Sequence, residues 1–204
     1  MSALVLHEYA ASGNCYKVRL AAAHAGVTIE RREYDITQGQ TRTPAFLTGV
    51  NANGQIPVLQ VGTRFLPESN AAAFYLADGT AMVPDDPFDR ADVLRWLFWE
   101  QYHHEPNIAT LRYWRQHPDP DLAEERSAAT PAKHLAGEAA LRLMDDHLGA
   151  RAWLVGGALT LADLCLYAYT HVAEEGGFAL ARYPAVAAWL GRVAAHPRHV
   201  TLAA

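Results

Sequence analysis

All strand-like segments of this chain fall within its first 80 residues, and this distribution restricts the possible folds more than any other feature of the sequence. Short apolar or β-branched runs at 3–6, 27–34, 58–61 and 65–66 alternate there with helix-like segments. The turn-forming segment Pro-Asp-Asp-Pro at 84–87 follows, and the apolar spacing after it is helical throughout. The pattern predicts an α/β domain over 1–80, a linker over 81–88 and an all-helical domain over 89–204.

In the first domain the predicted order is strand, helix and strand, followed by a strand hairpin and a second helix (βαβ-ββα). The first helix is expected over 15–25, after a cluster of turn formers, and Gly26 ends it. The hairpin turns at Gly62, and Ser69 is expected to cap the helix that follows it. The βαβ half requires a parallel strand pair with a right-handed crossover.

In the second domain helical spacing predicts helices over 90–102, 122–148, 161–174 and from 184 onward. Pro106 is expected to bend or break the first of these, and Pro131 to make the second irregular. Thr160 and Asp163 have the spacing of a capping box, in which each side chain accepts from the other residue's backbone N–H. The helix that they begin is apolar nearly all round, so we expect it to form the core of the second domain.

Composition restricts the compartment and the partners. The formal net charge is −5 and the pI is about 6.0, which argues against nucleic acid or an anionic membrane as the main partner. Cys15 and Cys165 are too few for a thiolate zinc site or a disulfide framework, and we expect no metal. No segment has the length of a membrane span and no basic leader begins the chain. We therefore expect a cytoplasmic protein.

The segment from Asn53 to Leu59 carries the first sign of a binding site. Asn-Gly predicts a turn, and Pro57 stands where the turn becomes a strand, a position in which proline is tolerated and X-Pro bonds are often cis. If the Ile56–Pro57 bond is cis, the N–H and C=O of Ile56 face outward, where an extended ligand could pair with them. An ordinary turn leading into a strand is the alternative.

Four motifs, taken together in their order and spacing, resemble the cytosolic glutathione transferases over essentially the whole chain: Ser12 with Val18-Arg19, Gly54-Gln55-Ile56-Pro57, Glu68-Ser69, and Thr160-Leu161-Ala162-Asp163. The resemblance implies a thioredoxin-like first domain and a helical second domain. It further implies a cytoplasmic detoxification enzyme that joins glutathione to a small hydrophobic electrophile. A homodimer is also implied, in which the first domain of one subunit faces the helical domain of the other.

The resemblance gives Ser12 the place of the catalytic serine in theta-, phi- and zeta-like members. A free thiol has a pKa of about 8.5, so reaction at neutral pH requires hydrogen bonds and positive potential at the glutathione sulfur. A serine just before a helix can supply both, and it can also cap that helix. Asn14 stands where zeta members carry cysteine, and the loop 47–51 is one residue longer than usual. The first departure argues against maleylacetoacetate-isomerase activity.

By the same resemblance, Gln55, Ile56 and Pro57 match the residues that hold the cysteinyl-glycine part of glutathione. Glu68 and Ser69 match the pair that holds its γ-glutamyl end. A helix N-terminus attracts anions, so Ser69 suits the γ-glutamyl carboxylate, and Glu68 suits the ammonium group beside it. Simple N-capping is the alternative for this pair.

The resemblance places the electrophile beside the start of the helical domain, where Tyr102 or Tyr113 could line its pocket. Packing within the core and between the domains is the alternative for this aromatic segment. Cys165 lies in an apolar run and is expected in the core, and the histidines are expected on helix surfaces.

Two other functions remain open. The protein could be a glutathione-dependent disulfide reductase or peroxidase, acting through the bound thiol or through Cys15, which lies where glutaredoxin-like enzymes carry their nucleophile. It could also be a non-catalytic relative that serves as a protein-interaction module. The presence of Ser12, Pro57, Glu68 and Ser69 together argues against a module, which has no need of all of them.

Overall fold

The computed structural model describes residues 3–204, which form two compact units. The first unit extends to Val83 and also includes residues 197–204, and the second spans 84–196. The sequence placed 197–204 with the helices, because their only local signal is the end of a helical pattern. The structure places them with the first unit.

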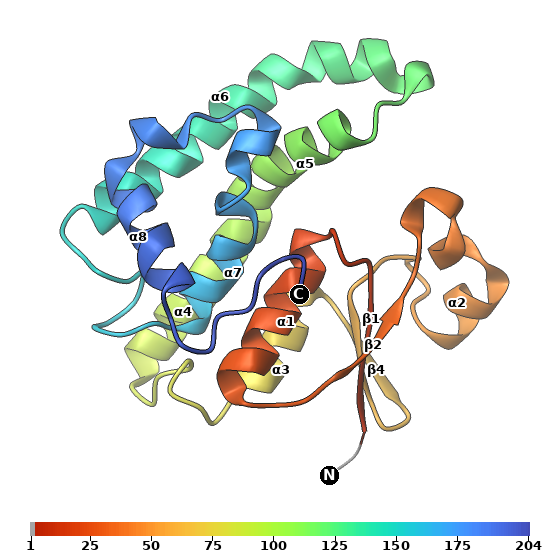
Figure 1. The fold of residues 1–204 in the computed structure, drawn as a ribbon, viewed down its shortest axis with the longest axis horizontal. Coiled ribbons are helices and arrows are strands. Elements are labelled where there is room, and N and C mark those ends of the chain that lie inside the picture. Colours follow the sequence, from red (N-terminus) through yellow and green to blue (C-terminus); the bar gives the residue numbers. More distant parts are fainter. Residues whose placement is uncertain (1–2) are drawn as a thin grey trace. The chain divides into compact units, whose positions relative to one another are not determined.

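The first unit contains β1 (Leu4–Glu8), α1 (Gly13–Ala25), β2 (Glu30–Glu33), 3-10 turns at Ile36–Gln38 and Gln40–Arg42, α2 (Pro44–Gly49), β3 (Val58–Val61), β4 (Arg64–Pro67) and α3 (Ser69–Ala77). Its sheet has the strand order β2-β1-β3-β4, with β1 and β2 parallel and the other pairs antiparallel. Helices α1 and α3 pack together on one side of the sheet and α2 lies on the other (Figure 1). The predicted βαβ-ββα order is confirmed.

The second strand is shorter than the sequence predicted. The β-rich run suggested 27–34, whereas β2 covers only Glu30–Glu33 and all its side chains are exposed. It is an edge strand that pairs only with β1, and charged side chains are typical of such an edge because they discourage further pairing. An alternation of apolar and polar residues could not mark its ends, because neither face is buried.

The register of the sheet determines where its loops meet. Leu6 of β1 lies opposite Leu59 of β3, and both are fully buried. One residue further along β1, His7 lies opposite Val58, which in turn lies opposite Pro67 of β4. The end of β1, the start of β3 and the end of β4 therefore meet at one edge of the sheet. The candidate residues follow or precede these three strand ends.

Residues 197–204 are held by side chains of α1. The Tyr16 hydroxyl donates to Val200 O at 2.5 Å, and Arg198 Nη1 donates to His24 O at 2.5 Å. Arg19 Nη1 donates to Ala204 O at 2.8 Å. These bonds bring polar groups into a helix that is otherwise buried in the unit, which explains why the segment packs there.

The second unit contains only helices, as predicted: α4 (Pro87–Trp99), a π-helical turn (Glu100–His104), α5 (Glu105–Gln116), α6 (Ala123–Leu148), α7 (Leu161–Thr170) and α8 (Pro184–Ala194), with 3-10 turns at Pro120–Leu122, Ala173–Gly176 and Leu180–Arg182. Pro106 does not break the first helix. It lies in the first turn of α5, directly after the π-helical turn, where the missing N–H of proline does not cost a hydrogen bond within the helix. Pro131 lies inside α6, which continues past it.

Helix α7 is buried along its whole length, as expected for the core of this unit. It begins with the predicted capping box of Thr160 and Asp163. It ends at Thr170, earlier than the predicted 174. The 3-10 turn Ala173–Gly176 follows, and its C-cap is Gly177, whose φ of +96° suits glycine. Among the helices of residues 3–204, none is both long enough and apolar enough to cross a membrane.

Candidate functional site

The edge of the sheet described above brings together most of the residues that the sequence singled out. Ser12 follows β1, Ile56 and Pro57 precede β3, and Glu68 and Ser69 follow β4. The strand pairing alone requires these segments to be neighbours. Direct bonds between α1 and α3, described below, join two of them.

Ser12 is the N-cap of α1, with extended backbone angles (φ −75°, ψ 125°). Its Oγ accepts from Cys15 N at 3.4 Å, which is a long capping bond. Its own N–H donates to Tyr9 O at 2.9 Å. The hydroxyl is half-buried and forms a side-chain hydrogen bond with the Cys15 thiol, so an acceptor placed before α1 would compete with that sulfur for its proton. Capping and a second role are compatible.

The loop that carries Ser12 is fixed at several points. Ala10 N donates to Glu33 Oε1 at 2.8 Å, and Arg19 Nη2 donates to Ala10 O at 2.7 Å. Arg19 is itself held by an ion pair with the buried carboxylate of Glu8, at 3.4 Å, and by a bond of 2.9 Å to Leu202 O. Residues far apart in the sequence therefore fix the position of this loop.

Cys15 is fully buried in the first turn of α1, and its Sγ accepts from Tyr9 N at 3.4 Å. Burial raises the pKa of the Cys15 thiol to about 12, and the bonds from Tyr9 and Ser12 only partly offset this effect. Reactive cysteines have the opposite properties, a lowered pKa and partial exposure. The geometry therefore does not favour Cys15 as a nucleophile.

The corner before β3 has a cis Ile56–Pro57 peptide bond. The ladder begins at Val58, so the N–H and C=O of Ile56 lie outside it. Pro57 is buried, Ile56 is half-buried and Gln55 is exposed. The side chain of Asn51 holds this loop, because its Nδ2 donates to Gln55 O at 2.9 Å. An extended ligand has access to the backbone of Ile56 beside the side chain of Gln55.

Gly54 makes this corner possible. Its φ is +63°, and a Cβ there would lie 2.6 Å from Arg42 Nη1. The same Arg42 nitrogen donates to Asn53 O at 2.9 Å. The backbone angle favours glycine, whereas the exposed Arg42 side chain could shift; the positive φ is the physical basis of the Asn-Gly signal in the sequence.

At the start of α3 the sequence-based assignment of the cap was wrong. Glu68, not Ser69, is the N-cap residue, and neither side chain makes a capping bond. The Ser69 hydroxyl instead donates to Asn14 Oδ1 at 3.1 Å and accepts from Lys17 Nζ at 3.5 Å. Glu68 is exposed and its φ of +72° is unfavourable for a residue with a side chain. Backbone strain of this kind costs on the order of 1–3 kcal/mol and is concentrated at functional sites. Simple capping therefore does not explain this pair.

Lys17 and Asn14 are the residues that sequence reasoning missed. Lys17 is fully buried in α1, and its ammonium group lies beside the N-terminus of α3. Its position three residues after Asn14 puts both side chains on one face of α1. That spacing was visible in the sequence, but a lysine on a helix is usually solvated, and only the packing of α1 on α3 shows that this one is not. The ammonium adds positive potential where a helix dipole already attracts anions.

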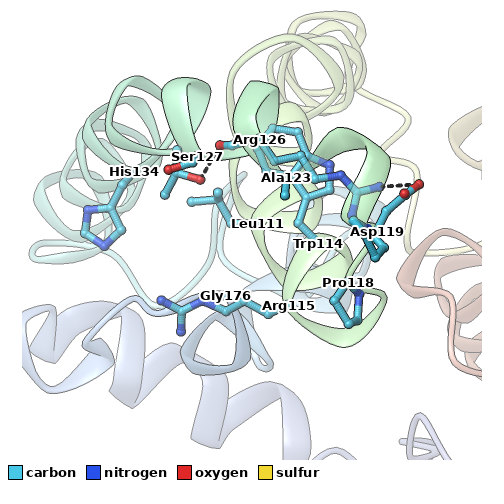
Figure 2. A pocket seen from close by; sticks show the side chains of 12 residues that line it. Leu111, Trp114, Arg115, Pro118, Asp119, Ala123, Arg126, Ser127, His134 and Gly176 are labelled. Carbon is cyan, nitrogen blue, oxygen red and sulfur yellow. Dashed lines mark hydrogen bonds and ion pairs between the residues drawn. The ribbon is translucent and has the colours of Figure 1, made fainter.

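Tyr102 and Tyr113 are not brought together. Tyr102 lies in the π-helical turn and is 80% exposed, whereas Tyr113 lies in α5, is 41% exposed and stacks on His117. Neither lines the pocket of about 390 Å³ that the second unit contains, whose walls include Leu111 and Trp114 (Figure 2).

Comparison with known proteins gives one consistent family. The model described as "Glutathione S-transferase, N-terminal domain" matches residues 4–78, and "Glutathione S-transferase, C-terminal domain" matches 101–197. The crystal structure of a glutathione S-transferase from Pseudomonas fluorescens is 44% identical, with a TM-score of 0.92 over 98% of this chain and 99% of that one. A theta-class glutathione S-transferase from Xanthomonas axonopodis pv. citri with glutathione bound is 29% identical, with a TM-score of 0.85 over 97% and 95%.

Curated relatives include a glutathione S-transferase-like protein and an elongation factor. A glutathione S-transferase-like protein, LUC7, from a Fusarium species is 31% identical over 195 residues, which are 90% of this chain and 85% of that protein. Elongation factor 1-gamma 3 of rice is 30% identical over 168 residues, but these are 80% of this chain and only 39% of that longer protein.

Proposed function

The chain belongs to the glutathione S-transferase family, and from this premise we propose that it is an enzyme that adds the thiolate of glutathione to a small hydrophobic electrophile. The observation that carries the proposal is the meeting of Ser12, Ile56, Glu68 and Ser69 at one edge of the sheet. In this proposal the first unit, which includes residues 197–204, is the glutathione-binding domain.

Each part of glutathione has a partner at this edge. The γ-glutamyl carboxylate lies at the N-terminus of α3, where the backbone N–H of Ser69 and the nearby ammonium of Lys17 attract an anion. The exposed carboxylate of Glu68 pairs with the γ-glutamyl ammonium. The cysteinyl part is extended and pairs with the backbone of Ile56, beside Gln55. The glutathione bound in the Xanthomonas relative supports glutathione as the ligand.

Ser12 acts on the sulfur. Its hydroxyl donates a hydrogen bond to the thiolate, and the N-terminus of α1 adds positive potential, so both lower the pKa of the thiol. The thiol proton leaves to solvent before the reaction. The sulfur lone pair then forms a bond to the electrophilic carbon, and the leaving group departs with the electron pair of the bond that breaks. The chain supplies no nucleophile of its own, in accordance with the burial of Cys15.

We propose a cytoplasmic homodimer, in which the first domain of one subunit faces the helical domain of the other. Light scattering is expected to give about twice the chain mass of 22.4 kDa. A mass of one chain at micromolar concentration would contradict the dimer without affecting the assignment of the glutathione site.

A second function, a non-catalytic interaction module, is favoured by the similarity to elongation factor 1-gamma. Retention on immobilised glutathione separates the two, because a module has no need to bind it. Two assays distinguish a transferase from a reductase that acts through bound glutathione: a transferase conjugates an aryl halide, whereas a reductase reduces hydroxyethyl disulfide.

The deciding experiment compares Ser12→Ala with the parent and with Ser12→Thr, which keeps a hydroxyl. Thiolate absorbance of bound glutathione is measured against pH. One lost donor is expected to raise the thiol pKa by about one to two units, because each unit reflects ~1.4 kcal/mol. The rate at neutral pH is expected to fall roughly tenfold to a hundredfold, with glutathione affinity within a few-fold.

Thr63→Ala, in the exposed hairpin turn of the same unit, is the matched control and is expected to titrate like the parent. If Ser12→Ala also titrates like the parent, the hydroxyl does not act on the sulfur and Ser12 is a cap alone.

A further inference from the structure

Residues 197–204 lie beside α1, the helix that follows Ser12 (Figure 1). Their hydrogen bonds reach from His24, near the C-terminal end of this helix, to Tyr16, near its start. The segment therefore contacts α1 over most of the length of the helix.

Arg19 joins this segment to the loop that carries Ser12. Its Nη2 donates both to Leu202 O at 2.9 Å and to Ala10 O at 2.7 Å, which uses the two hydrogens of that nitrogen. Its Nη1 donates to Ala204 O at 2.8 Å, and its Nε lies 3.4 Å from the carboxylate of Glu8. The side chain of Arg19 is only 5% exposed, so bulk water does not replace a lost acceptor unless the structure rearranges.

The bond from Arg19 to Ala10 O differs from the bond that Ala10 makes through its N–H. Ala10 N donates to Glu33 Oε1 at 2.8 Å, but Glu33 is an exposed residue of the edge strand β2. Water competes for an exposed hydrogen bond, whereas a buried hydrogen bond to a charged group is stronger. The buried guanidinium therefore restricts the loop more than the exposed glutamate does.

We infer that residues 197–204 hold the Ser12 loop in its reactive position through Arg19, which makes Arg19 a positioning residue for the conjugation reaction. The inference rests on the proposed function, because the position of Ser12 matters only if its hydroxyl acts on glutathione. A guanidinium is planar and rigid, so the acceptors at Leu202 and Ala204 also fix the direction of the N–H that points to Ala10. Without these acceptors the guanidinium is free to turn, and the loop loses its buried bond.

Cys15 reports the position of this loop without any glutathione. Its fully buried Sγ accepts from Tyr9 N at 3.4 Å and is hydrogen-bonded to the side chain of Ser12. A thiol reagent therefore reaches this sulfur when the loop opens locally. Cys165, buried in α7 of the other unit, is the internal reference.

The test compares the full chain with a variant that lacks residues 201–204. The variant loses the acceptors Leu202 O and Ala204 O, while the residues that bond Tyr16 and His24 remain. Both proteins are labelled with N-ethylmaleimide in the absence of glutathione, and each cysteine is followed by mass spectrometry of its peptide. We expect Cys15 of the variant to react at least about tenfold faster, since tenfold is ~1.4 kcal/mol and a hydrogen bond to a charged group contributes as much. We expect Cys165 to react at the parental rate.

The same variant is then assayed with glutathione. We expect kcat for conjugation to fall by about threefold to tenfold and KM for glutathione to stay within about twofold, because the γ-glutamyl contacts are unchanged. The thiol pKa of bound glutathione is expected to rise, since the Ser12 hydroxyl is displaced from the sulfur. Loss of stability alone does not shift this titration.

Substitutions in the full chain show whether the effect passes through Arg19. Arg19→Gln is expected to accelerate Cys15 labelling as the deletion does, and the two changes together are expected to have no larger effect than either alone. Arg19→Lys keeps the charge beside Glu8 but not the planar fork, so it is expected to retain most of the stability in urea without restoring kcat. Arg198→Gln removes the bond to His24, at the other end of α1, and is the matched control; it is expected to label within about twofold of the parent.

Parental reactivity of Cys15 in the deletion variant would overturn the inference. Equal acceleration of Cys15 and Cys165 would overturn it too, because it would show global unfolding and not movement of the loop. Effects that multiply in the double variant, or full kcat in Arg19→Lys, would show that the planar fork of Arg19 does not carry the coupling. If the parent does not conjugate glutathione, the proposed function is wrong, whereas the labelling of Cys15 still decides whether residues 197–204 hold the loop.

Discussion

Asp163 is the residue whose replacement is expected to cost the most stability. Its carboxylate is fully buried and accepts four hydrogen bonds. Oδ1 accepts from Leu154 N at 3.0 Å and from Trp189 Nε1 at 2.9 Å. Oδ2 accepts from Thr160 N at 2.8 Å and from the Thr160 hydroxyl at 3.0 Å. The capping box accounts only for the bond from Thr160 N, so the carboxylate also joins α7 to α8 and to the segment before α7.

The magnitude follows from counting the donors that each substitution leaves without an acceptor. A lost cap alone costs about 0.5–2 kcal/mol. Asp163→Ala leaves the buried N–H groups of Leu154, Thr160 and Trp189 unpaired, at about 1–3 kcal/mol each if independent. Burial raises the pKa of Asp163, so removing the carboxylate recovers part of a desolvation cost. The expected net loss is about 3–5 kcal/mol, the range for breaking a buried charged network.

Asp163→Asn separates the acceptors. An asparagine Oδ1 still accepts from Leu154 and Trp189, and the Thr160 hydroxyl can rotate to accept from the new amide. Only the N–H of Thr160 then meets another donor, which costs about 1–3 kcal/mol. Asp146→Ala, an exposed aspartate of α6, is the matched control and is expected to change stability by less than about 0.5 kcal/mol.

The assay is urea unfolding, followed by far-UV circular dichroism and by tryptophan fluorescence. With a slope of about 2 kcal/mol per molar urea, Asp163→Ala is expected to lower the midpoint by roughly 1.5–2.5 M and Asp163→Asn by about 0.5–1.5 M. If both variants lose the same stability, charge and not the number of acceptors is decisive. If Asp163→Ala unfolds like the parent but loses activity, the structural role of Asp163 is wrong.

The remaining predictions concern the first unit. Burial lowers the pKa of His7, so folding disfavours its protonated form, and the stability of the protein declines as the pH falls below 6.5, by at most about 1.4 kcal/mol per pH unit. His7→Asn is expected to remove this decline in urea titrations from pH 7.5 to 5; the same dependence of stability on pH in parent and variant would contradict it. Because both cysteines are buried and burial raises the pKa of Cys15 to about 12, Ellman's reagent is expected to detect no thiol in the native protein and two in urea. Cys15→Ser is expected to keep nearly full conjugation activity, and loss of a disulfide-reductase activity in that variant would favour a redox role instead. Glu68→Gly relieves the strain of a positive φ and is expected to raise the free energy of unfolding by about 1 kcal/mol, whereas Glu68→Ala is expected to bring no such gain. Both variants are expected to weaken glutathione binding by about 1–3 kcal/mol, and unchanged affinity of both in calorimetry would remove Glu68 from the site.

The fold was predictable from the sequence where local rules determine it. The hairpin at Gly62, the end of α1 at Gly26 and the capping box of α7 were all expected from turn and capping chemistry, and each is present. The extent of β2 was not, because an edge strand with exposed side chains leaves no alternation of polar and apolar residues. The packing of 197–204 on α1 was not either, because it depends on tertiary bonds from Tyr16 and Arg19.

The sequence predicted the segments that form the candidate site but not the hydrogen bonds between their side chains. Asn-Gly before Pro57, and Glu68-Ser69 before a helix, identified the segments, and strand pairing brings them to one edge. The role of the Ser69 hydroxyl could not be predicted, since a serine at a helix start is expected to cap it. Its actual partners, Asn14 and Lys17, lie more than fifty residues away in the sequence, on a helix whose packing against α3 only the structure provides.

The partners of Ser69 bear on how the proposed site would hold an anion. The hydroxyl has one proton, and Asn14 Oδ1 accepts it, while Lys17 donates to the same oxygen. A carboxylate at this end of α3 would therefore be held first by backbone N–H groups, by the helix dipole and by the buried ammonium, all of which are fixed before the ligand arrives. Ser12 stands at the N-terminus of the neighbouring helix, with its half-buried hydroxyl beside the Cys15 thiol. Two helix N-termini and one buried cation thus provide positive potential at a single edge of the sheet, which is the condition under which a thiolate forms at neutral pH without any nucleophile from the protein.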